Sequence, residues 1–260
     1  MDLQLKSKVV LITGGAKGIG AAIVRACAVE EAVPVVVDKD IEAGRQLQSE
    51  LEKSGKKSGF ISADLTSAQD CALAVEQTLR EFGRLDVLVN NAGINDRVGL
   101  EHGSPEKYVG SLERNLLHYY NMAHYALPAL KKSQGCIVNT ASKTAVTGQG
   151  GTSGYVAAKG AILALTREWA VELLPYGIRV NAVVPAEVMT PLYRQWLDTF
   201  PDPEEKLREI TAKIPLGKRM TLPEEIAATV LFLISGQARH VTGQHLYVDG
   251  GYVHLDRALT

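Results

Sequence analysis

Cysteine and histidine are scarce in this chain of 260 residues. Its three cysteines, Cys27, Cys71 and Cys136, lie far apart and lack the C-x-x-C spacing of many metal and redox sites, so we expect buried free thiols. The six histidines are scattered and form no recognisable ligand set. No metal site is therefore predicted.

An excess of charge of either sign is also missing. Lys and Arg number 28 and Asp and Glu 29, which gives a net charge of −1. Because phosphate binding usually leaves a basic surface, nucleic acid is not expected as a partner. No apolar run approaches the roughly 18 residues that cross a bilayer, and the first residues contain no apolar signal region. We therefore expect a cytoplasmic protein without membrane contact.

Short apolar runs alternate with longer amphipathic stretches along the whole chain. Nearly continuous apolar runs are typical of strands that helices cover on both faces, and the alternation indicates parallel strands with right-handed crossovers. Strands are predicted at 9–13, 33–38, 59–62, 87–90, 136–140, 179–184 and 245–248, and helices near 18–31, 41–54, 67–83, 105–131, 155–174 and 223–235.

These elements predict one α/β domain over residues 1–260. We expect a doubly wound Rossmann fold, with a seven-stranded parallel sheet and helices on both faces. No linker or repeat divides the chain. The least regular stretch, about 186–221, contains four prolines between helix-like pieces, and we interpret it as a substrate lid.

A glycine-rich turn, T-G-G-A-K-G-I-G at 13–20, follows the first strand and opens the first helix. Glycine permits positive φ and close backbone approach, and a helix N-terminus attracts a pyrophosphate. Such a turn alone is a weak signal for a dinucleotide site, but its place after the first strand strengthens it. The turn predicts cofactor contacts at Gly14, Lys17, Gly18, Ile19 and Gly20.

Asp38 ends the second strand, at the spacing from the glycine-rich turn that is typical of ribose binding. A carboxylate there accepts hydrogen bonds from the adenosine ribose and repels a 2′-phosphate, which favours NAD over NADP. Two cations, Lys17 and Lys39, argue for NADP, since either could bind that phosphate. After the third strand, Asp64-Leu65 lies where a side chain can bond the adenine amino group, with a turn or capping role for Asp64 as the alternative.

Tyr155 and Lys159 lie four residues apart in S-G-Y-V-A-A-K, so on a helix they share one face. Ser142 follows the predicted strand at 136–140. Hydride transfer between an alcohol and a carbonyl needs a proton relay at the same oxygen, and tyrosine, with an ordinary pKa of about 10, is poorly suited to this near neutral pH. A neighbouring ammonium lowers that pKa. We predict that Tyr155 carries the proton, Lys159 lowers its pKa and Ser142 holds the substrate oxygen.

Together these motifs resemble the short-chain dehydrogenase/reductase family. The resemblance also includes N-N-A-G at 90–93, Asn115 and V-T-G-Q-H-L-Y-V-D-G-G at 241–251, and it runs from about residue 5 to 253. It implies an oxidoreductase with a nicotinamide cofactor, in which Asn115 holds a water that links Lys159 to solvent. It further implies that Lys159 binds the nicotinamide ribose.

The resemblance assigns further positions to the cofactor. It places Asn91, Ala92 and Gly93 beside the adenosine, and Pro185, Val188 and Thr190 near the nicotinamide carboxamide. The family usually has glycine after that proline, whereas this chain has Ala186.

More distinctive segments, such as N-D-R-V-G-L at 95–100 and V-P-A-E-V-M-T-P-L-Y-R at 184–194, resemble bacterial L-fucose dehydrogenases. Those enzymes oxidise the anomeric hydroxyl of a pyranose to a lactone with NAD, so NAD and a sugar are the expected cofactor and substrate. Polar residues that flank the predicted substrate position suit a molecule with several hydroxyl groups. They are Asn95, Lys143, Gln149, Thr152, Glu187 and Tyr193. Glu187 would penalise an acyl or steroid tail, but its pairing with Lys143 is the alternative.

Other functions stay open at this point. A 3-oxoacyl reductase or a hydroxysteroid dehydrogenase would use the same scaffold, although Lys131-Lys132 is the only basic pair suited to an acyl-carrier protein. A non-catalytic NAD-binding regulatory or scaffold protein would be expected to have a broken Ser/Tyr/Lys set, and the set is complete here. The resemblance also implies a homodimer or homotetramer. Because the tail sequence is distinctive, we add the hypothesis that His254 and Asp256 line a neighbouring subunit's pocket.

Overall fold

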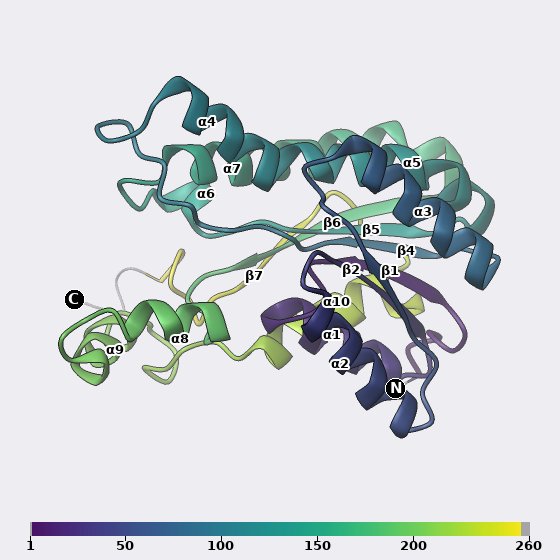
Figure 1. Ribbon diagram of the computed structural model, residues 1–260, viewed down its shortest axis with the longest axis horizontal. Coiled ribbons are helices and arrows are strands. Elements are labelled where there is room, and N and C mark those ends of the chain that lie inside the picture. The colour runs from purple at the N-terminus through teal and green to yellow at the C-terminus, as the bar shows by residue number, and fades with distance from the viewer. Residues whose placement is uncertain (1, 256–260) are drawn as a thin grey trace.

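The chain folds around a parallel sheet of seven strands with helices on both faces (Figure 1). The computed structural model describes residues 2–255. Across the sheet the order is β3 (Gly59–Ser62), β2 (Val33–Asp38), β1 (Val9–Thr13), β4 (Val87–Asn90), β5 (Cys136–Thr140), β6 (Arg179–Pro185) and β7 (His245–Val248). The order reverses between β1 and β4. Ligands bind at the carboxyl ends of strands at such a switch point.

The helices form two layers. α1 (Gly18–Val29), α2 (Ile41–Lys53) and α10 (Pro223–Ile234) cover one face, and α3 (Ala68–Phe82), α4 (Pro105–Leu112), α5 (His118–Ser133) and α7 (Ser153–Glu172) cover the other (Figure 1). Short turns lie in the connections: α6 (Thr144–Thr147), η2 (Leu174–Tyr176) and η3 (Gly236–Ala238). The 186–221 segment contains α8 (Pro191–Leu197) and α9 (Pro203–Thr211), which lie to one side of the sheet (Figure 1). Within residues 2–255, no helix has the length and apolarity to span a bilayer.

Successive strand residues enter two separate cores. Leu11 and Val35 pack into the core beneath α3, α5 and α7, whereas Ile12 and Val36 pack into the core with α1 and α10. Because neighbouring strand residues point to opposite faces, both must be apolar where helices cover both faces. This explains why continuous apolar runs located the strands. Six of the predicted strands match residue for residue, and β6 extends by one residue to Pro185.

All three cysteines are buried and unpaired, as predicted. Burial raises the pKa of Cys27 to about 12 and the pKa values of Cys71 and Cys136 to about 11. Because the thiolate is the reactive form, these thiols are unreactive near neutral pH. The described part of the chain contains no cluster of His, Cys, Asp or Glu that could hold a metal ion.

The helix predicted at 105–131 contains a π-helical turn. It consists of α4, a π-helical turn η1 (Glu113–Leu117), and α5, which continues to Ser133. Asn115 lies in the π turn, and its side chain bonds both Ser111 in the preceding helix and Ile94 in the loop after β4. Such turns are frequent at functional sites. The predicted helix is therefore present, since the chain is helical without a break from Pro105 to Ser133. Its π turn was not predicted, because a hydrophobic pattern does not record these polar contacts.

Candidate active site

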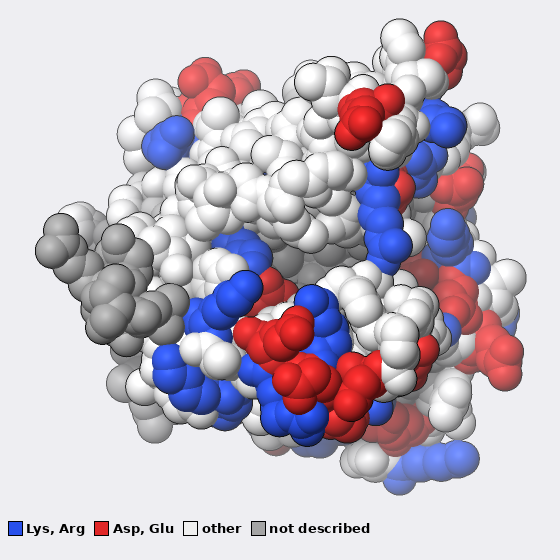
Figure 2. Space-filling view, turned by 90° about the vertical axis from the view of Figure 1, so that its left-hand side faces the viewer, with Lys and Arg blue, Asp and Glu red and all other residues white. Residues whose placement is uncertain are grey.

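The loops that follow the strands meet at the face shown in Figure 2. This face is hollowed near its centre, with charged side chains of both signs gathered along one side of the hollow and a largely uncharged wall on the other. The residues predicted for the cofactor and for catalysis come from these loops, from the π turn that contains Asn115 and from the first two turns of α1 and α7.

The glycine-rich loop fits a pyrophosphate. Gly14 and Gly18 adopt positive φ values of 62° and 55°, and a Cβ on Gly20 would lie 2.1 Å from the Gly14 carbonyl oxygen. These positions therefore require glycine. α1 begins at Gly18, and its N-cap residue Lys17 makes no side-chain hydrogen bond to the first turn. The N–H groups and dipole of that turn suit the diphosphate of a dinucleotide.

Thr13 and Asn91 hold this loop between β1 and β4. Thr13 Oγ1 accepts from the backbone N–H groups of Asn91 and Ala92 at 2.9 and 3.1 Å. Asn91 Nδ2 donates to the carbonyl oxygens of Thr13 and Gly14, both at 3.1 Å. Asn91 and Ala92, which were predicted at the cofactor, thus lie directly behind the glycine-rich loop. The role of Thr13 was missed, although Thr13 begins the glycine motif.

The Asp38 carboxylate is fixed beside the glycine-rich loop. Its Oδ2 accepts from the Ala16 N–H at 3.1 Å, and its Oδ1 accepts from the Asp40 N–H at 3.0 Å. The nearby Lys17 ammonium pairs with Asp40 at 2.5 Å, and this hydrogen bond raises the pKa of Lys17. One of the two cations that could bind a 2′-phosphate is therefore already neutralised by a carboxylate.

Asp64 and Leu65 make structural contacts after β3. Asp64 Oδ1 accepts from the N–H and the hydroxyl of Thr66 at 3.0 and 2.8 Å, and these bonds lower the pKa of Asp64. Leu65 packs against the hydrophobic core. The turn role left open for Asp64 is present, and an adenine contact stays a prediction.

Lys159 is buried beneath the catalytic face. Its ammonium donates to Tyr119 Oη at 3.0 Å and to the Thr140 carbonyl oxygen at 2.7 Å. Tyr119 is fully buried and donates to the same carbonyl at 2.9 Å. Burial lowers the pKa of Lys159 to about 7. Tyr119 was missed in the sequence, although it lies four residues after Asn115, where a helix places it on a neighbouring surface.

Tyr155 and Ser142 lie together above Lys159. The Lys159 ammonium is 5.6 Å from the centroid of the Tyr155 ring. Burial raises the pKa of Tyr155, and a hydrogen bond from Ser142 acts in the opposite direction. Ser142 Oγ also accepts from the N–H and hydroxyl of Thr144 at 3.3 and 3.1 Å, which orients it. Burial penalises the charged form of both residues, and a lowering of the Tyr155 pKa by Lys159 stays a prediction.

Asn115 lies next to Lys159 with Gly93 between them. Asn115 Oδ1 accepts from the Ile94 N–H at 2.7 Å, and its Nδ2 donates to the Ser111 carbonyl at 3.0 Å. A Cβ on Gly93 would lie 3.2 Å from Asn115 Oδ1 and 3.3 Å from Lys159 Nζ. The structure thus brings Gly93, Asn115 and Lys159 together, although they lie far apart in the sequence.

The nicotinamide positions adjoin the glycine-rich loop. A Cβ on Gly18 would lie 3.3 Å from Thr190 Cγ2, so these two predicted cofactor residues are neighbours. Val188 is buried and forms a β-bridge with Thr221. Ala186, where the family has glycine, does not adopt a positive φ. Its side chain therefore causes no backbone strain.

Three predicted substrate residues form one polar cluster. Glu187 accepts from the Lys143 ammonium and, at 2.7 Å, from the Tyr193 hydroxyl. The Lys143 ammonium also lies 3.9 Å from the centroid of the Tyr252 ring, a cation–π contact. The backbone N–H of Lys143 donates to the Pro185 carbonyl at 2.9 Å, which joins the ends of β5 and β6. Pairing of Lys143 with Glu187, the alternative left open above, is what the structure shows.

The other three predicted substrate residues belong to two loops that touch. A Cβ on Gly99 would lie 2.9 Å from Gly151 Cα, so the loops after β4 and β5 are in contact. Asn95 Oδ1 accepts from a backbone N–H of its own loop at 3.3 Å. Gln149 is exposed, and the Thr152 hydroxyl is buried without a hydrogen-bond partner. Among the described residues, none of these three hydrogen-bonds to the Lys143 cluster.

Residues 14–253 match the family model described as "Enoyl-(Acyl carrier protein) reductase". The chain belongs to the short-chain dehydrogenase/reductase family. This dehydrogenase is an oxidoreductase that acts on CH–OH groups, and its family binds a nicotinamide cofactor. It is 41% identical to the L-fucose dehydrogenase of Bos taurus over 96% of this chain and 91% of that one. It is 36% identical to the cyclopentanol dehydrogenase of Comamonas testosteroni over 96% of this chain and 98% of that one.

Solved structures of similar dehydrogenases show the same fold. Cj0485 dehydrogenase superposes with a TM-score of 0.95 at 46% identity, covering 100% of this chain and 99% of that one. The ligand-free aldohexose dehydrogenase of Thermoplasma acidophilum gives 0.87 at 32% identity, covering 97% and 96%. An actinorhodin polyketide ketoreductase with NADPH gives 0.90 at 31% identity, covering 95% and 98%. These similarities confirm the predicted fold and family.

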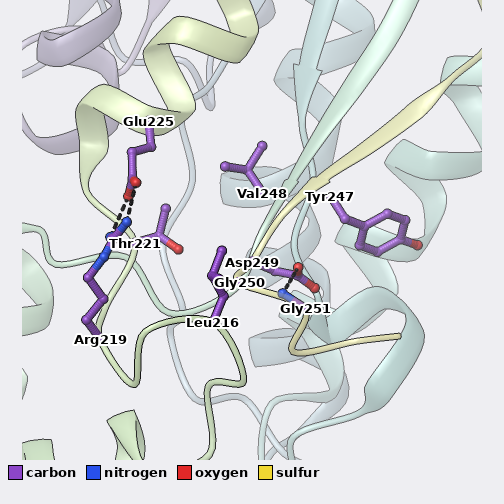
Figure 3. Close-up of a pocket in the computed structure, with 9 residues that line it drawn as sticks. All are labelled: Leu216, Arg219, Thr221, Glu225, Tyr247, Val248, Asp249, Gly250 and Gly251. Carbon is purple, nitrogen blue, oxygen red and sulfur yellow. Dashed lines mark hydrogen bonds and ion pairs between the residues drawn. The ribbon is translucent and has the colours of Figure 1, made fainter. Parts of the chain in front are cut away.

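A cavity of about 300 Å³ opens at the carboxyl end of β7 of the dehydrogenase (Figure 3). Arg219 pairs with Glu225 on one side of it, and Asp249 accepts from the Gly251 N–H on the other. None of the residues that line it belongs to the Ser142, Tyr155, Lys159 set. This cavity is therefore separate from the residues predicted for catalysis.

Proposed function

We propose that this dehydrogenase oxidises the anomeric hydroxyl of L-fucose, or of a closely related aldose, to the lactone with NAD. The observation that carries the proposal is the polar cluster of Lys143, Glu187 and Tyr193 that begins one residue after Ser142. A pyranose offers hydroxyl groups that can hydrogen-bond to such a cluster, whereas an acyl chain or a steroid ring system would desolvate the cluster without offering such bonds. The 41% identity to an L-fucose dehydrogenase supports the same assignment.

NAD is the cofactor that the charges favour. Asp38 and Asp40 place two carboxylates where a 2′-phosphate would otherwise approach the glycine-rich loop. Lys17 is held by Asp40, which leaves exposed Lys39 as the competing cation. Electrostatic repulsion from the carboxylates therefore supports NAD over NADP.

The residues around Tyr155 are arranged to move one proton. A nicotinamide held by the glycine-rich loop would supply the acceptor for the hydride of the substrate carbon. Ser142 donates a hydrogen bond to the substrate oxygen, and Tyr155 takes the proton that leaves this oxygen. A neutral Lys159 amine first takes the proton of Tyr155, which leaves an ammonium beside a tyrosinate whose charges offset each other. This tyrosinate is the form of Tyr155 that takes the substrate proton. Tyr119 and the Thr140 carbonyl hold the Lys159 nitrogen in place for this exchange.

A 3-oxoacyl reductase is the competing function on this scaffold. The description of the matching family model favours it. Recognition of an acyl-carrier protein needs a basic surface, and the ammonium of Lys131 lies 3.7 Å from the centroid of the Tyr176 ring instead of extending freely. The Lys143–Glu187 pair also places charge where an acyl chain would need an apolar wall.

We further propose a homodimer or homotetramer in the cytoplasm. Large apolar side chains are exposed on the helix layer formed by α4, η1, α5 and α7, as expected for a surface that another subunit covers: Val109, Leu117, Tyr120, Tyr125 and Val171. Three unpaired thiols suit a reducing compartment. The His254 ring packs edge-on against Tyr247 of its own chain, and Asp256 lies outside the described residues. A role for the tail in a neighbouring subunit stays a prediction.

Steady-state kinetics with the purified protein test this function through the absorbance of the reduced nicotinamide. With NAD, we expect kcat/KM for L-fucose to exceed that for cyclopentanol by about 10-fold or more, because a sugar has further hydroxyl groups for the polar cluster, whereas the one hydroxyl of cyclopentanol is the reacting group. We expect no reduction of a 3-oxoacyl thioester with NADH. Turnover of the thioester but not of the sugar would contradict the sugar assignment and identify a 3-oxoacyl reductase. NAD binding without turnover of any substrate would support a regulatory or scaffold protein.

A further inference from the structure

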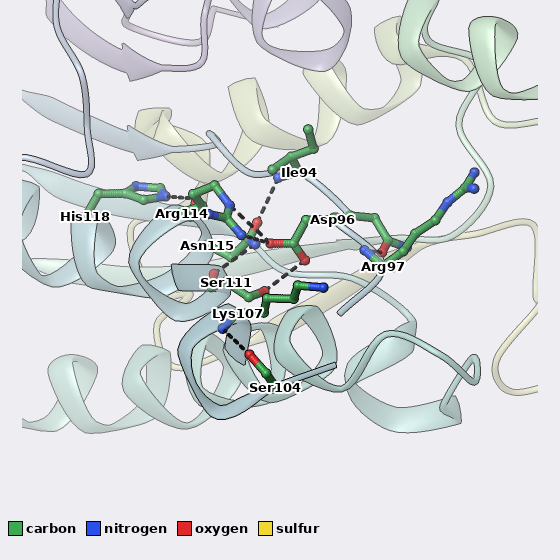
Figure 4. A network of polar contacts seen from close by, with 10 residues as sticks. Ile94, Asp96, Arg97, Ser104, Lys107, Ser111, Arg114, Asn115 and His118 are labelled. Carbon is green, nitrogen blue, oxygen red and sulfur yellow. Dashed lines mark hydrogen bonds and ion pairs between the residues drawn. The ribbon is translucent and has the colours of Figure 1, made fainter. Parts of the chain in front are cut away.

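Asp96 closes a ring of hydrogen bonds around the π turn (Figure 4). Its Oδ2 accepts from Nε and Nη2 of Arg114 at 3.2 and 2.7 Å, and its Oδ1 accepts from Ser111 Oγ at 2.9 Å. The Asn115 side chain completes the ring, because it bonds the Ser111 carbonyl on one side and the Ile94 N–H on the other. The loop after β4 and the helix that carries Asn115 are thereby fastened to each other.

The ring reaches the catalytic residues on two sides. Ser111 is fully buried, and a Cβ on Gly154 would lie 2.4 Å from its Oγ. The first turn of α7 therefore packs directly on Ser111, one residue before the catalytic tyrosine. On the other side the loop continues from Gly93, which adjoins both Asn115 and the catalytic lysine. A shift of the ring would move all three elements relative to one another.

The contact between Asp96 and Arg114 is directional. The Asp96 side chain is 12% exposed and that of Arg114 is 42% exposed. Two N–H groups of the guanidinium converge on Oδ2 of Asp96 while the Ser111 hydroxyl donates to Oδ1, so both carboxylate oxygens are held. A partly exposed ion pair contributes little to stability, since solvent screens it. We therefore expect the Asp96–Arg114 pair to matter more for the orientation of the loop after β4 than for the stability of the protein.

We propose that Asp96 is a positioning residue of this dehydrogenase. It holds the 94–96 loop against the π turn, so that Asn115 keeps the orientation that the proton relay needs. Asp96 acts through Asn115 and does not touch the reacting atoms. This role rests on the dehydrogenase activity and not on the choice of sugar.

A double-mutant cycle in kcat tests this role with Asp96→Ala, Asn115→Ala and the double variant. We expect Asp96→Ala to lower kcat about 10- to 100-fold, because small misplacements of a relay are costly. The double variant is expected to be no slower than Asn115→Ala, since residues that act through one another are not additive. The KM for NAD is expected to stay within about twofold in Asp96→Ala. Losses that multiply in the double variant, or a wild-type kcat in Asp96→Ala, would overturn the proposal.

Glu50→Ala is the matched control. Arg25 also donates two hydrogen bonds to one carboxylate, that of Glu50, where each bond goes to a different oxygen; this pair lies between α1 and α2 and away from the catalytic residues. This control is expected to keep the wild-type kcat. Asp96→Asn keeps an acceptor for Ser111 and is expected to have an intermediate kcat, and it replaces Asp96→Ala in the cycle if that variant does not fold.

Two substrates separate this proposal from the sugar assignment. If wild-type protein oxidises cyclopentanol but not L-fucose, the proposed sugar fails and the cycle is run with cyclopentanol. Hydrogen exchange of peptides that cover 94–100 and 111–117 needs no substrate. We expect faster exchange in Asp96→Ala than in wild type or Glu50→Ala, and unchanged exchange at 111–117 would contradict the role of Asp96.

Discussion

Lys159 donates a hydrogen bond to the Tyr119 hydroxyl at 3.0 Å, in a place where both side chains are buried. Its second partner, the Thr140 carbonyl, is also neutral. Burial therefore lowers the pKa of Lys159 from 10.5 to about 7. A lysine held in this way disfavours folding while it prepares the nitrogen to exchange a proton near neutral pH.

Lys159→Met is expected to abolish oxidation. It is also expected to raise the free energy of unfolding above that of wild type, by more at low pH than at high pH. Below about pH 7 the folded and unfolded chains both carry the ammonium, so the folded protein bears the full desolvation penalty. As the pH rises the folded protein loses the proton first, and the penalty disappears above the ordinary lysine pKa of 10.5. Urea unfolding of both proteins at about pH 6, 8 and 10 measures the difference.

The free-energy advantage of Lys159→Met is thus expected to shrink as the pH rises. An advantage that grows with pH would contradict the lowered pKa. Lys107→Met, which removes an exposed charge, is the control. Tyr119 still donates to the Thr140 carbonyl in the Lys159→Met variant, so that carbonyl keeps a partner.

Tyr155→Phe is expected to lower kcat about 100-fold or more, because the hydroxyl that carries the proton is removed. The dissociation constant for NADH, measured by fluorescence, is expected to change little, since the glycine-rich loop is intact. Tyr120→Phe, at an exposed tyrosine, is expected to keep the wild-type kcat. A Tyr155→Phe variant with near-wild-type kcat would assign the proton to another group.

Asp40→Asn is expected to increase the use of NADP. The substitution removes the charge that holds Lys17, while asparagine caps α2 about as well as aspartate. We expect the ratio of kcat/KM for NADP to that for NAD to rise about 10-fold, the effect of roughly 1.4 kcal/mol. Asp202→Asn, at the N-cap of α9, is the matched control. An unchanged ratio would show that Lys17 does not reach the ribose.

Replacing the Lys143–Glu187 pair with Met and Leu is expected to exchange one substrate class for another. The double variant loses about 10-fold or more in kcat/KM for L-fucose and gains activity with cyclopentanol, because an apolar wall replaces the polar one. Each single variant is expected to unfold at a lower temperature than the double variant, since one buried charge is then left unpaired. Equal losses with both substrates would contradict a role in selectivity. Lys206→Ala/Glu209→Ala removes an exposed pair as the control.

The sheet, the glycine-rich loop and the shared helix face of Tyr155 and Lys159 could be predicted because each produces a local sequence pattern. Strands covered on both faces are apolar throughout, and glycine is required where the loop after β1 adopts positive φ at Gly14 and Gly18. Tyr155 and Lys159 share a helix face, so their spacing is visible in the sequence.

The remaining features depend on contacts between distant segments. The π turn is held by bonds from Asn115 to a loop 21 residues away, and Tyr119 reaches Lys159 across 40 residues. The raised pKa of Tyr155 results from burial, which a spacing of four residues does not reveal. For the same reason the sequence left open whether Lys143 pairs with Glu187 or with a substrate.

The most direct test of the proposed reaction follows one hydrogen atom. L-Fucose carrying deuterium at its anomeric carbon is incubated with the protein and NAD, and the reduced cofactor is analysed by mass spectrometry. Oxidation at the anomeric hydroxyl predicts that deuterium moves to the nicotinamide and that the reaction slows relative to unlabelled L-fucose. Reduced cofactor without deuterium, or no reduction of NAD at all, would contradict this reaction.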